Sequence, residues 1–126
     1  MKDKQHNVLI IGAGLAGLYA ALSLAPRPVT ILSPKPLGFD ASSAWAQGGV
    51  AAAMDEHDTP EAHANDTVIA GDGIVDADIA AFVTAAAKEH VLELVEVGTP
   101  FDRTKDGDFV MSKEAAHSFA RVVRVK

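Results

Sequence analysis

Three glycines at fixed spacing are the residues of this sequence best suited to hold a phosphorylated ligand. Residues 12–17 read Gly-Ala-Gly-Leu-Ala-Gly and match the pattern G-x-G-x-x-G. In this pattern the first glycine permits a tight turn, the second lets the backbone approach a pyrophosphate, and the third lets a helix pack closely on a strand. The N–H groups at the helix start then face the phosphates. A glycine turn that serves only the fold is the alternative.

The position at which this fingerprint normally ends in an acidic residue is occupied by a serine. The acidic side chain is expected about twenty residues after the first glycine, where it bonds a ribose hydroxyl. Ser33 stands 21 residues after Gly12 and is followed by Pro34 and Lys35, whereas Asp40 lies beyond a proline-containing loop. A serine hydroxyl bonds a ribose more weakly than a carboxylate does. The residues alone therefore leave NAD and FAD undecided.

The elements that must position this loop are a strand, a helix and a second strand. Residues 7–11 and 29–32 are short apolar runs rich in β-branched side chains. Between them leucines recur at helical spacing over residues 14–25, and Pro26 and Pro28 end the helix. A strand, helix and strand within about thirty residues form a βαβ unit with parallel strands. The sequence thus predicts an α/β, Rossmann-like fold.

Two further helices are expected downstream. Thr59 and Pro60 are typical of a helix start and Gly71 of its end. A second helix is expected from Asp76 to Gly98, either as one kinked helix or as two abutting ones. The other expected elements are a loop over 36–49, a strand over 50–53, a hairpin over 101–111 with its turn at 105–108, and an extended segment over 121–126.

The composition is that of one globular domain of 126 residues, with 48% hydrophobic and 22% charged side chains. A net charge of −6 excludes nucleic acid and an anionic membrane surface as partners. The absence of cysteine excludes disulfides, thiolate metal sites and cysteine nucleophiles. No charged residue occurs from Val8 to Ala25, so a cleaved signal peptide is an alternative. Asp3 and the three interrupting glycines favour a cytoplasmic protein instead.

The acidic stretch at residues 55–58, followed by Glu61 and His63, contains side chains that bind metals. A solvated acidic loop before a helix explains the same residues better. No metal site is therefore predicted.

Beyond the glycine loop, four segments carry a more specific signal. They are Ser-Ser-Ala-Trp-Ala-Gln-Gly-Gly-Val-Ala-Ala at 42–52; the set His63, Asp66, Thr67, Ala70, Gly71, Gly73 and Asp76; Gly98 with Phe101, Asp102 and Arg103; and Glu114 to Ser118 followed by Arg121 and Val122. In these segments the chain resembles the N-terminal part of the L-aspartate oxidase family, within the succinate dehydrogenase and fumarate reductase flavoproteins.

The resemblance implies an FAD-binding domain, of which residues 1–126 would be an incomplete N-terminal part, with a capping domain encoded elsewhere. It also implies oxidation of L-aspartate to iminoaspartate in quinolinate and NAD biosynthesis. Oxygen or fumarate would then accept the electrons, and quinolinate synthase would be a partner. In this family the catalytic arginine lies later in the chain. We therefore expect no catalytic residue within residues 1–126, no turnover of L-aspartate by this chain alone, and weak binding of FAD.

The resemblance also assigns site residues. It places Gly12, Ala13, Gly14, Leu15, Ala16 and Gly17 on the pyrophosphate, and Ser33 and Lys35 near the adenosine. It places Ser42, Ser43, Ala44, Gln47, Gly48 and Gly49 along the ribityl chain and flavin ring. Glu114 would pair with the substrate ammonium. From the residues alone, Glu114 and His117 have helical spacing, and the interpretation is that His117 only orients that carboxylate. Related enzymes that tether the flavin covalently use a histidine five positions before the glutamine, where this chain has Ser42. Non-covalent FAD is therefore expected.

Other interpretations remain open at this point. A flavoprotein subunit of a succinate dehydrogenase or fumarate reductase is the nearest alternative. A non-catalytic NAD-binding Rossmann module and a secreted binding domain are two others. Without the resemblance, Gly48 and Gly49 would be interpreted as an ordinary turn.

Overall fold

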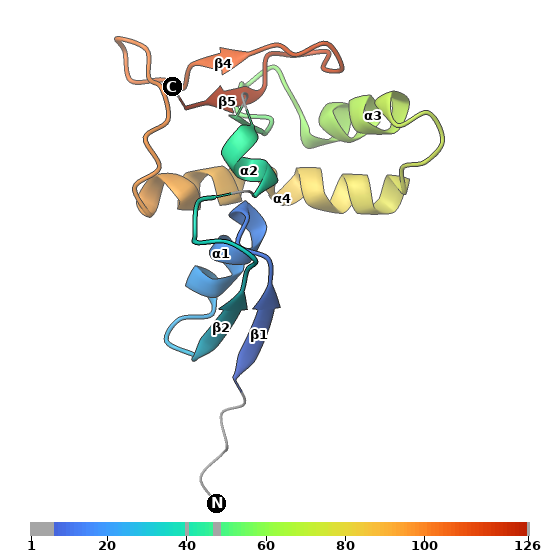
Figure 1. Cartoon of the computed structure of the whole chain (residues 1–126). Helices are drawn as coiled ribbons and strands as arrows, with labels where there is room; N and C mark the ends of the chain where they lie inside the picture. Colours follow the sequence, from blue (N-terminus) through green and yellow to red (C-terminus); the bar gives the residue numbers. More distant parts are fainter. Residues whose placement is uncertain (1–6, 40, 47–48, 126) are drawn as a thin grey trace, which may run out of the picture. The chain divides into compact units, whose positions relative to one another are not determined.

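The computed structural model describes residues 7–39, 41–46 and 49–125. The chain divides into two compact units, residues 1–47 and residues 48–126. Figure 1 shows the elements of both units.

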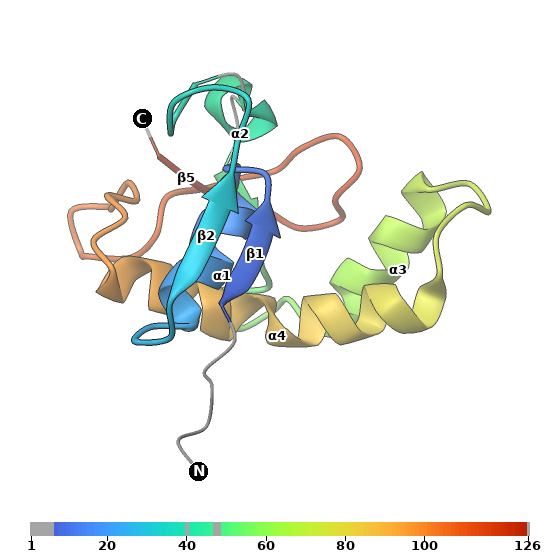
Figure 2. The same ribbon diagram turned by 60° about the horizontal axis from the view of Figure 1, so that its bottom comes forward.

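The first unit contains the predicted βαβ arrangement. Strand β1 (Val8–Ile11) pairs in parallel with β2 (Val29–Leu32), and helix α1 (Leu15–Ser23) connects them. Helix α1 contacts both strands and lies behind them in the view of Figure 2. The α/β fold with a parallel sheet is thus confirmed. The uncharged run from Val8 onward is a strand, a turn and a helix, and no helix among the described residues is long and apolar enough to cross a bilayer.

A four-residue helix, α2 (Ser42–Trp45), lies inside the segment that was expected to be a loop. This part of the prediction was wrong, because a single helical turn is too short to produce an apolar period. The turn begins with a hydrogen bond from the Ala44 N–H to the Ala41 carbonyl oxygen (2.8 Å).

The second unit joins an antiparallel sheet to a helical pair. The strands follow the order β3 (Gly49–Ala51), β5 (Val122–Arg124), β4 (Met111–Ser112). Helices α3 (Pro60–Ala70) and α4 (Ala77–Glu96) lie side by side (Figure 1). The strand expected over residues 50–53 is β3, which starts one residue earlier and ends two residues earlier than expected. The extended segment at the end of the chain became the central strand β5.

The helix boundaries follow the capping residues that the sequence indicated. The Thr59 hydroxyl accepts a hydrogen bond from the Ala62 N–H (3.1 Å) at the start of α3, and Gly71 caps its end. The Asp76 carboxylate accepts from the N–H groups of Asp78 (3.0 Å) and Ile79 (3.1 Å) at the start of α4. Helix α4 is one continuous helix, since no glycine or proline interrupts residues 77–96.

The core of the second unit lies between α4 and the sheet. It consists of Ala52, Val91, Phe101 and Val123, all nearly or fully buried. The predicted hairpin over 101–111 is confirmed by the antiparallel bridge between Arg103 and Phe109 and by a hydrogen bond from the Thr104 N–H to the Asp108 carbonyl oxygen (2.9 Å).

Gly49 has a structural reason to be glycine, and this gives a test of the sheet. A Cβ atom at Gly49 would overlap the carbonyl oxygen of Val123 on β5. We expect Gly49→Ala to destabilise the second unit by about 1–3 kcal/mol, the usual effect of overpacking. Hydrogen exchange of the peptide that contains β5 measures this loss. Gly14→Ala is the control, since its Cβ would meet only ordinary contacts, the nearest being the Ser43 Oγ at 3.4 Å. Equal protection of β5 in both variants would contradict the expectation.

Candidate functional site

The glycine loop has the backbone that the fingerprint requires. Gly12 has a φ of +108°, a conformation that side chains with a Cβ rarely adopt. Its N–H donates to the Leu32 carbonyl oxygen (2.9 Å), which fixes the turn to the end of β2. A Cβ atom at Gly17 would overlap the Gly12 carbonyl oxygen, so Gly17 permits the close packing of α1 on the turn. The roles expected of the first and third glycines are therefore seen in the backbone.

The start of α1 offers N–H groups to an anion. Gly14 is the N-cap residue and has no side chain that could cap the helix. The Leu15 N–H donates to the Ser43 hydroxyl (3.0 Å), and no residue in the described ranges accepts from the N–H groups of Ala16 or Gly17. Unpaired N–H groups and the helix dipole together favour a phosphate at this position. The cradle thus fits the pyrophosphate of a dinucleotide.

A cavity of about 440 Å³ lies over this helix start. No described residue that lines it carries a formal charge, so an anion here would be held by backbone N–H groups and hydroxyls. Most of the residues predicted to bind the cofactor line the cavity. The lining residues are Ile11, Gly12, Ala13, Gly14, Leu15, Ala16, Gly17, Ser33, Pro34, Phe39, Ala41, Ser42 and Ser43.

The remaining predicted cofactor residues lie elsewhere. Lys35 and Ala44 are exposed and are not part of the cavity lining. Gln47 and Gly48 lie outside the described residues. Gly49 is in β3, so the interpretation of this position as a turn was wrong, and its cofactor role stays a prediction. Phe39 also lines the cavity and is 69% exposed, and no sequence motif indicated it.

The second predicted site centres on Glu114. Its side chain is exposed, and its Oε1 accepts a hydrogen bond from the Ser112 hydroxyl (2.9 Å). The His117 N–H donates to the Glu114 carbonyl oxygen (3.0 Å), which closes a turn rather than a helix. The imidazole of His117 lies edge-on to that of His63, with 5.4 Å between the ring centroids. The expectation that His117 orients the Glu114 carboxylate was wrong, because the two residues lie in a turn and the carboxylate accepts its hydrogen bond from the Ser112 hydroxyl.

A buried ionic cluster, which no sequence motif indicated, lies next to this turn. The Arg121 side chain is 0% exposed and forms a double hydrogen bond to Asp58, with Nε–Oδ2 at 2.9 Å and Nη2–Oδ1 at 2.8 Å. Its Nη1 donates to the Oδ2 of Asp66 (2.8 Å). Asp58 was expected in a solvated loop, which was wrong, because its carboxylate pairs with a buried guanidinium. The described residues contain no cluster suited to a metal ion.

Burial and hydrogen bonding shift two pKa values in this cluster. Burial lowers the pKa of His63 below 6.5, and the neighbouring charge of Arg121 lowers it further. The pKa of Asp66 is lowered below 3.8 chiefly because its carboxylate accepts hydrogen bonds from the N–H and hydroxyl of Ser118. At neutral pH the cluster therefore contains a neutral imidazole beside an ionised carboxylate.

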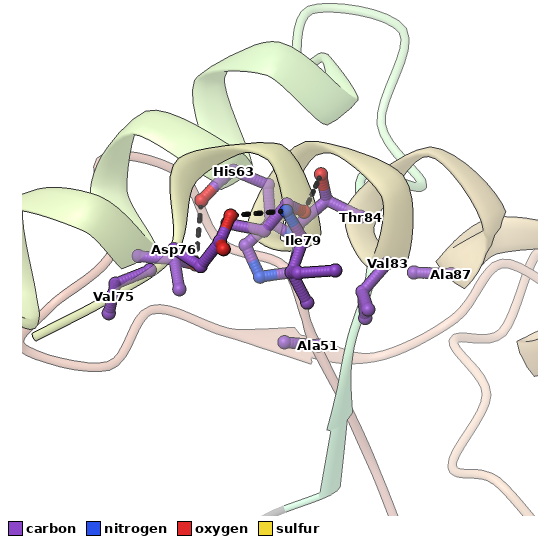
Figure 3. A pocket seen from close by; sticks show the side chains of 10 residues that line it. Ala51, His63, Val75, Asp76, Ile79, Val83, Thr84 and Ala87 are labelled. Carbon is purple, nitrogen blue, oxygen red and sulfur yellow. Dashed lines mark hydrogen bonds between the residues drawn. The ribbon is translucent and has the colours of Figure 1, made fainter.

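A separate cavity of about 330 Å³ lies between α3, α4 and β3 (Figure 3). Its wall is mostly apolar, with Ile79, Val83 and Ala87 from α4 and Ala51 from β3. His63 also lines it, and its Nδ1 is buried without a partner among the described residues. None of the predicted site residues lines this cavity.

The parallel βαβ unit and its glycine turn define a dinucleotide-binding domain. A family model described as an FAD binding domain matches residues 7–125. The chain belongs to this family, and FAD is thus confirmed as the cofactor of the class.

Within this family, the chain is similar to particular enzymes. The chain is 51% identical to an L-aspartate oxidase of Mesorhizobium japonicum over 91% of its length, and 51% identical to one of Caulobacter vibrioides over 93%. It covers 22% and 24% of these two relatives, so it spans less than a quarter of their length.

Solved structures support the same fold. A structure of Mycobacterium smegmatis Sdh1 in complex with UQ1 matches with a TM-score of 0.86 and 33% identity, over 95% of this chain and 21% of that one. An E. coli quinol fumarate reductase FrdA variant matches with a TM-score of 0.82 and 26% identity, over 93% of this chain and 20% of that one.

The lowered pKa of His63 predicts a pH dependence of stability. Because the folded protein resists protonation of His63, the unfolded chain takes up a proton first as the pH falls below 6.5. The free energy of unfolding should therefore decrease between pH 7.5 and 5.5, by at most about 1.4 kcal/mol per pH unit for one proton. Urea unfolding at several pH values measures this slope. His63→Gln should flatten this slope. Equal slopes in wild type and His63→Gln would contradict the assignment.

Proposed function

We propose that this chain is the N-terminal, FAD-binding part of an L-aspartate oxidase that converts L-aspartate to iminoaspartate in NAD biosynthesis. The observation that carries the proposal is the glycine cradle at the start of α1, in a chain that is 51% identical to two L-aspartate oxidases. The proposed setting is cytoplasmic, with oxygen or fumarate as electron acceptor and quinolinate synthase as a partner.

In this function the chain binds the cofactor and one end of the substrate. When bound, FAD supplies the acceptor for the hydride that leaves the carbon beside the amine. The N–H groups at the start of α1 hold the pyrophosphate. Ser33 and Lys35 contact the adenosine, and residues 42–44 and 47–49 contact the ribityl chain and flavin ring. The carboxylate of Glu114 pairs with the substrate ammonium by a charge-assisted hydrogen bond.

A flavoprotein subunit of the succinate dehydrogenase or fumarate reductase type is the second candidate. The similarity to Sdh1 and FrdA structures supports it. The higher identity to L-aspartate oxidases favours the first candidate. The two differ in whether the substrate carries an amine.

A chimera tests the function directly. In it, residues 7–125 replace the matching N-terminal segment of the Caulobacter vibrioides L-aspartate oxidase, to which this chain is 51% identical. We expect the purified chimera to contain FAD and to release product from L-aspartate. The unmodified host enzyme is the positive control, and the 126-residue chain alone, which we expect to be inactive, is the negative control. A chimera that oxidises succinate but not L-aspartate would favour the second candidate.

The assignment of Glu114 predicts a selective loss of affinity. In the chimera, Glu114→Gln should weaken L-aspartate at least about tenfold, since a charge-assisted hydrogen bond contributes about 1.5–3 kcal/mol. Inhibition by succinate, which lacks the amine, should change little. Steady-state KM values and inhibition constants measure both effects. Glu56→Gln is the control, because that side chain is 85% exposed in the second unit. Equal losses for the two ligands would give Glu114 a structural role only.

The serine at position 42 predicts that the flavin is bound without a covalent bond. A serine hydroxyl at its ordinary pKa is a poor nucleophile toward the flavin methyl carbon. Acid precipitation of the chimera should therefore leave yellow flavin in the supernatant. Flavin fluorescence retained on the denatured polypeptide would contradict this prediction.

A further inference from the structure

The Asp66 carboxylate accepts the hydrogen bonds that hold Ser118, four residues after Glu114. Its Oδ2 accepts from the Ser118 N–H (2.6 Å), from the Ser118 hydroxyl (2.7 Å) and from Nη1 of Arg121 (2.8 Å). These donors lie 52 and 55 residues away in the sequence. Three donors converge on one carboxylate oxygen, whose negative charge makes each hydrogen bond stronger than a neutral amide oxygen would.

A second carboxylate fixes the other side of the same guanidinium. Asp58, the residue before the N-cap of α3, binds Arg121 through both of its oxygens, and both side chains are 0% exposed. Arg121 directly precedes β5, so α3 is tied to the sheet through this residue. Of these two carboxylates, only Asp66 also accepts hydrogen bonds from Ser118. Asp58 holds Arg121 and does not contact Ser118.

The turn that carries Glu114 is thereby held at both ends. At its start, Ser112 pairs with Val122 in the sheet and donates its hydroxyl to Glu114 Oε1 (2.9 Å). At its end, Ser118 is bound to Asp66. In between, the His117 N–H donates to the Glu114 carbonyl oxygen (3.0 Å), and the His117 ring packs against His63 on α3.

We infer that Asp66 is a positioning residue, which fixes the turn from Glu114 to Ser118 and thereby aims the Glu114 carboxylate at the amine of the substrate. This inference rests on the proposed function. It assigns a role to Asp66, a motif residue that the proposed site does not otherwise use. A displacement of about 1 Å of a group that orients a substrate costs up to about a hundredfold in rate, so a remote anchor affects specificity.

The anchoring itself is measured in the 126-residue chain. Trypsin cleaves after Lys113, next to Glu114, and mass spectrometry follows the appearance of this cut. Asp66→Asn removes the charge that holds Ser118, so we expect the cut at Lys113 to be at least about tenfold faster than in wild type. Asp76→Ala is the matched control, since it removes the cap of α4 and leaves every contact of Asp66 in place. Equal acceleration in both variants, or none in Asp66→Asn, would overturn the anchoring.

The positioning role is measured in the chimera. We expect Asp66→Asn to raise the KM for L-aspartate about tenfold, with a smaller change in kcat and little change in inhibition by succinate. In a Glu114→Gln background, Asp66→Asn should add no further loss of L-aspartate affinity. Both substitutions remove the same interaction, the one between the Glu114 carboxylate and the substrate amine. Asp76→Ala should leave the ratio of the KM for L-aspartate to the inhibition constant of succinate unchanged.

The outcomes separate this inference from the proposed function. An unmutated chimera without L-aspartate oxidation overturns the proposed function and, with it, the substrate role of Asp66. An active chimera in which Asp66→Asn weakens L-aspartate and succinate equally overturns the inference alone. Additive losses of L-aspartate affinity from Asp66→Asn and Glu114→Gln would likewise overturn only the inference.

Discussion

The second unit depends on one buried guanidinium. The Arg121 side chain is 0% exposed and meets the carboxylates of Asp58 and Asp66, which are 0% and 11% exposed. Removing one partner of a buried pair typically costs about 3–5 kcal/mol, because it leaves an uncompensated charge. The three residues lie in two segments more than fifty positions apart, so their pairing ties α3 and the segment before it to the residue that precedes β5. The turn from Glu114 to Ser118 is held by the same Asp66 carboxylate, which accepts hydrogen bonds from Ser118.

The first unit forms a site for negative charge in which no described lining residue carries a positive side chain. Gly12 adopts a positive φ, Gly14 leaves the helix start uncapped, and Gly17 brings α1 onto the turn. The partial positive charge at the start of α1 comes from the peptide dipoles alone. Such a site suits a pyrophosphate, which backbone N–H groups can bind without a charged side chain.

Much of the architecture could be predicted from local patterns. Helix α3 begins at Pro60 after the Thr59 cap and ends at Gly71, as expected, because capping is decided by residues adjacent in sequence. The βαβ order followed from apolar runs and prolines for the same reason. The four-residue helix α2 escaped prediction, since one turn carries no period. Asp58 was misjudged as solvated, because its partner Arg121 is 63 residues away and nothing local indicates that pairing.

The sequence by itself determined the parallel βαβ unit, the glycine cradle and the helix boundaries, because each depends on backbone conformation and on neighbours within a few residues. Tertiary structure alone decided that β5 lies between β3 and β4, that Gly49 is required by the backbone of β5, and that Asp66 holds Ser118. These outcomes depend on pairing between residues that are distant in the sequence. A buried charge is stable only beside its counterion, and a strand is stable only beside a partner strand.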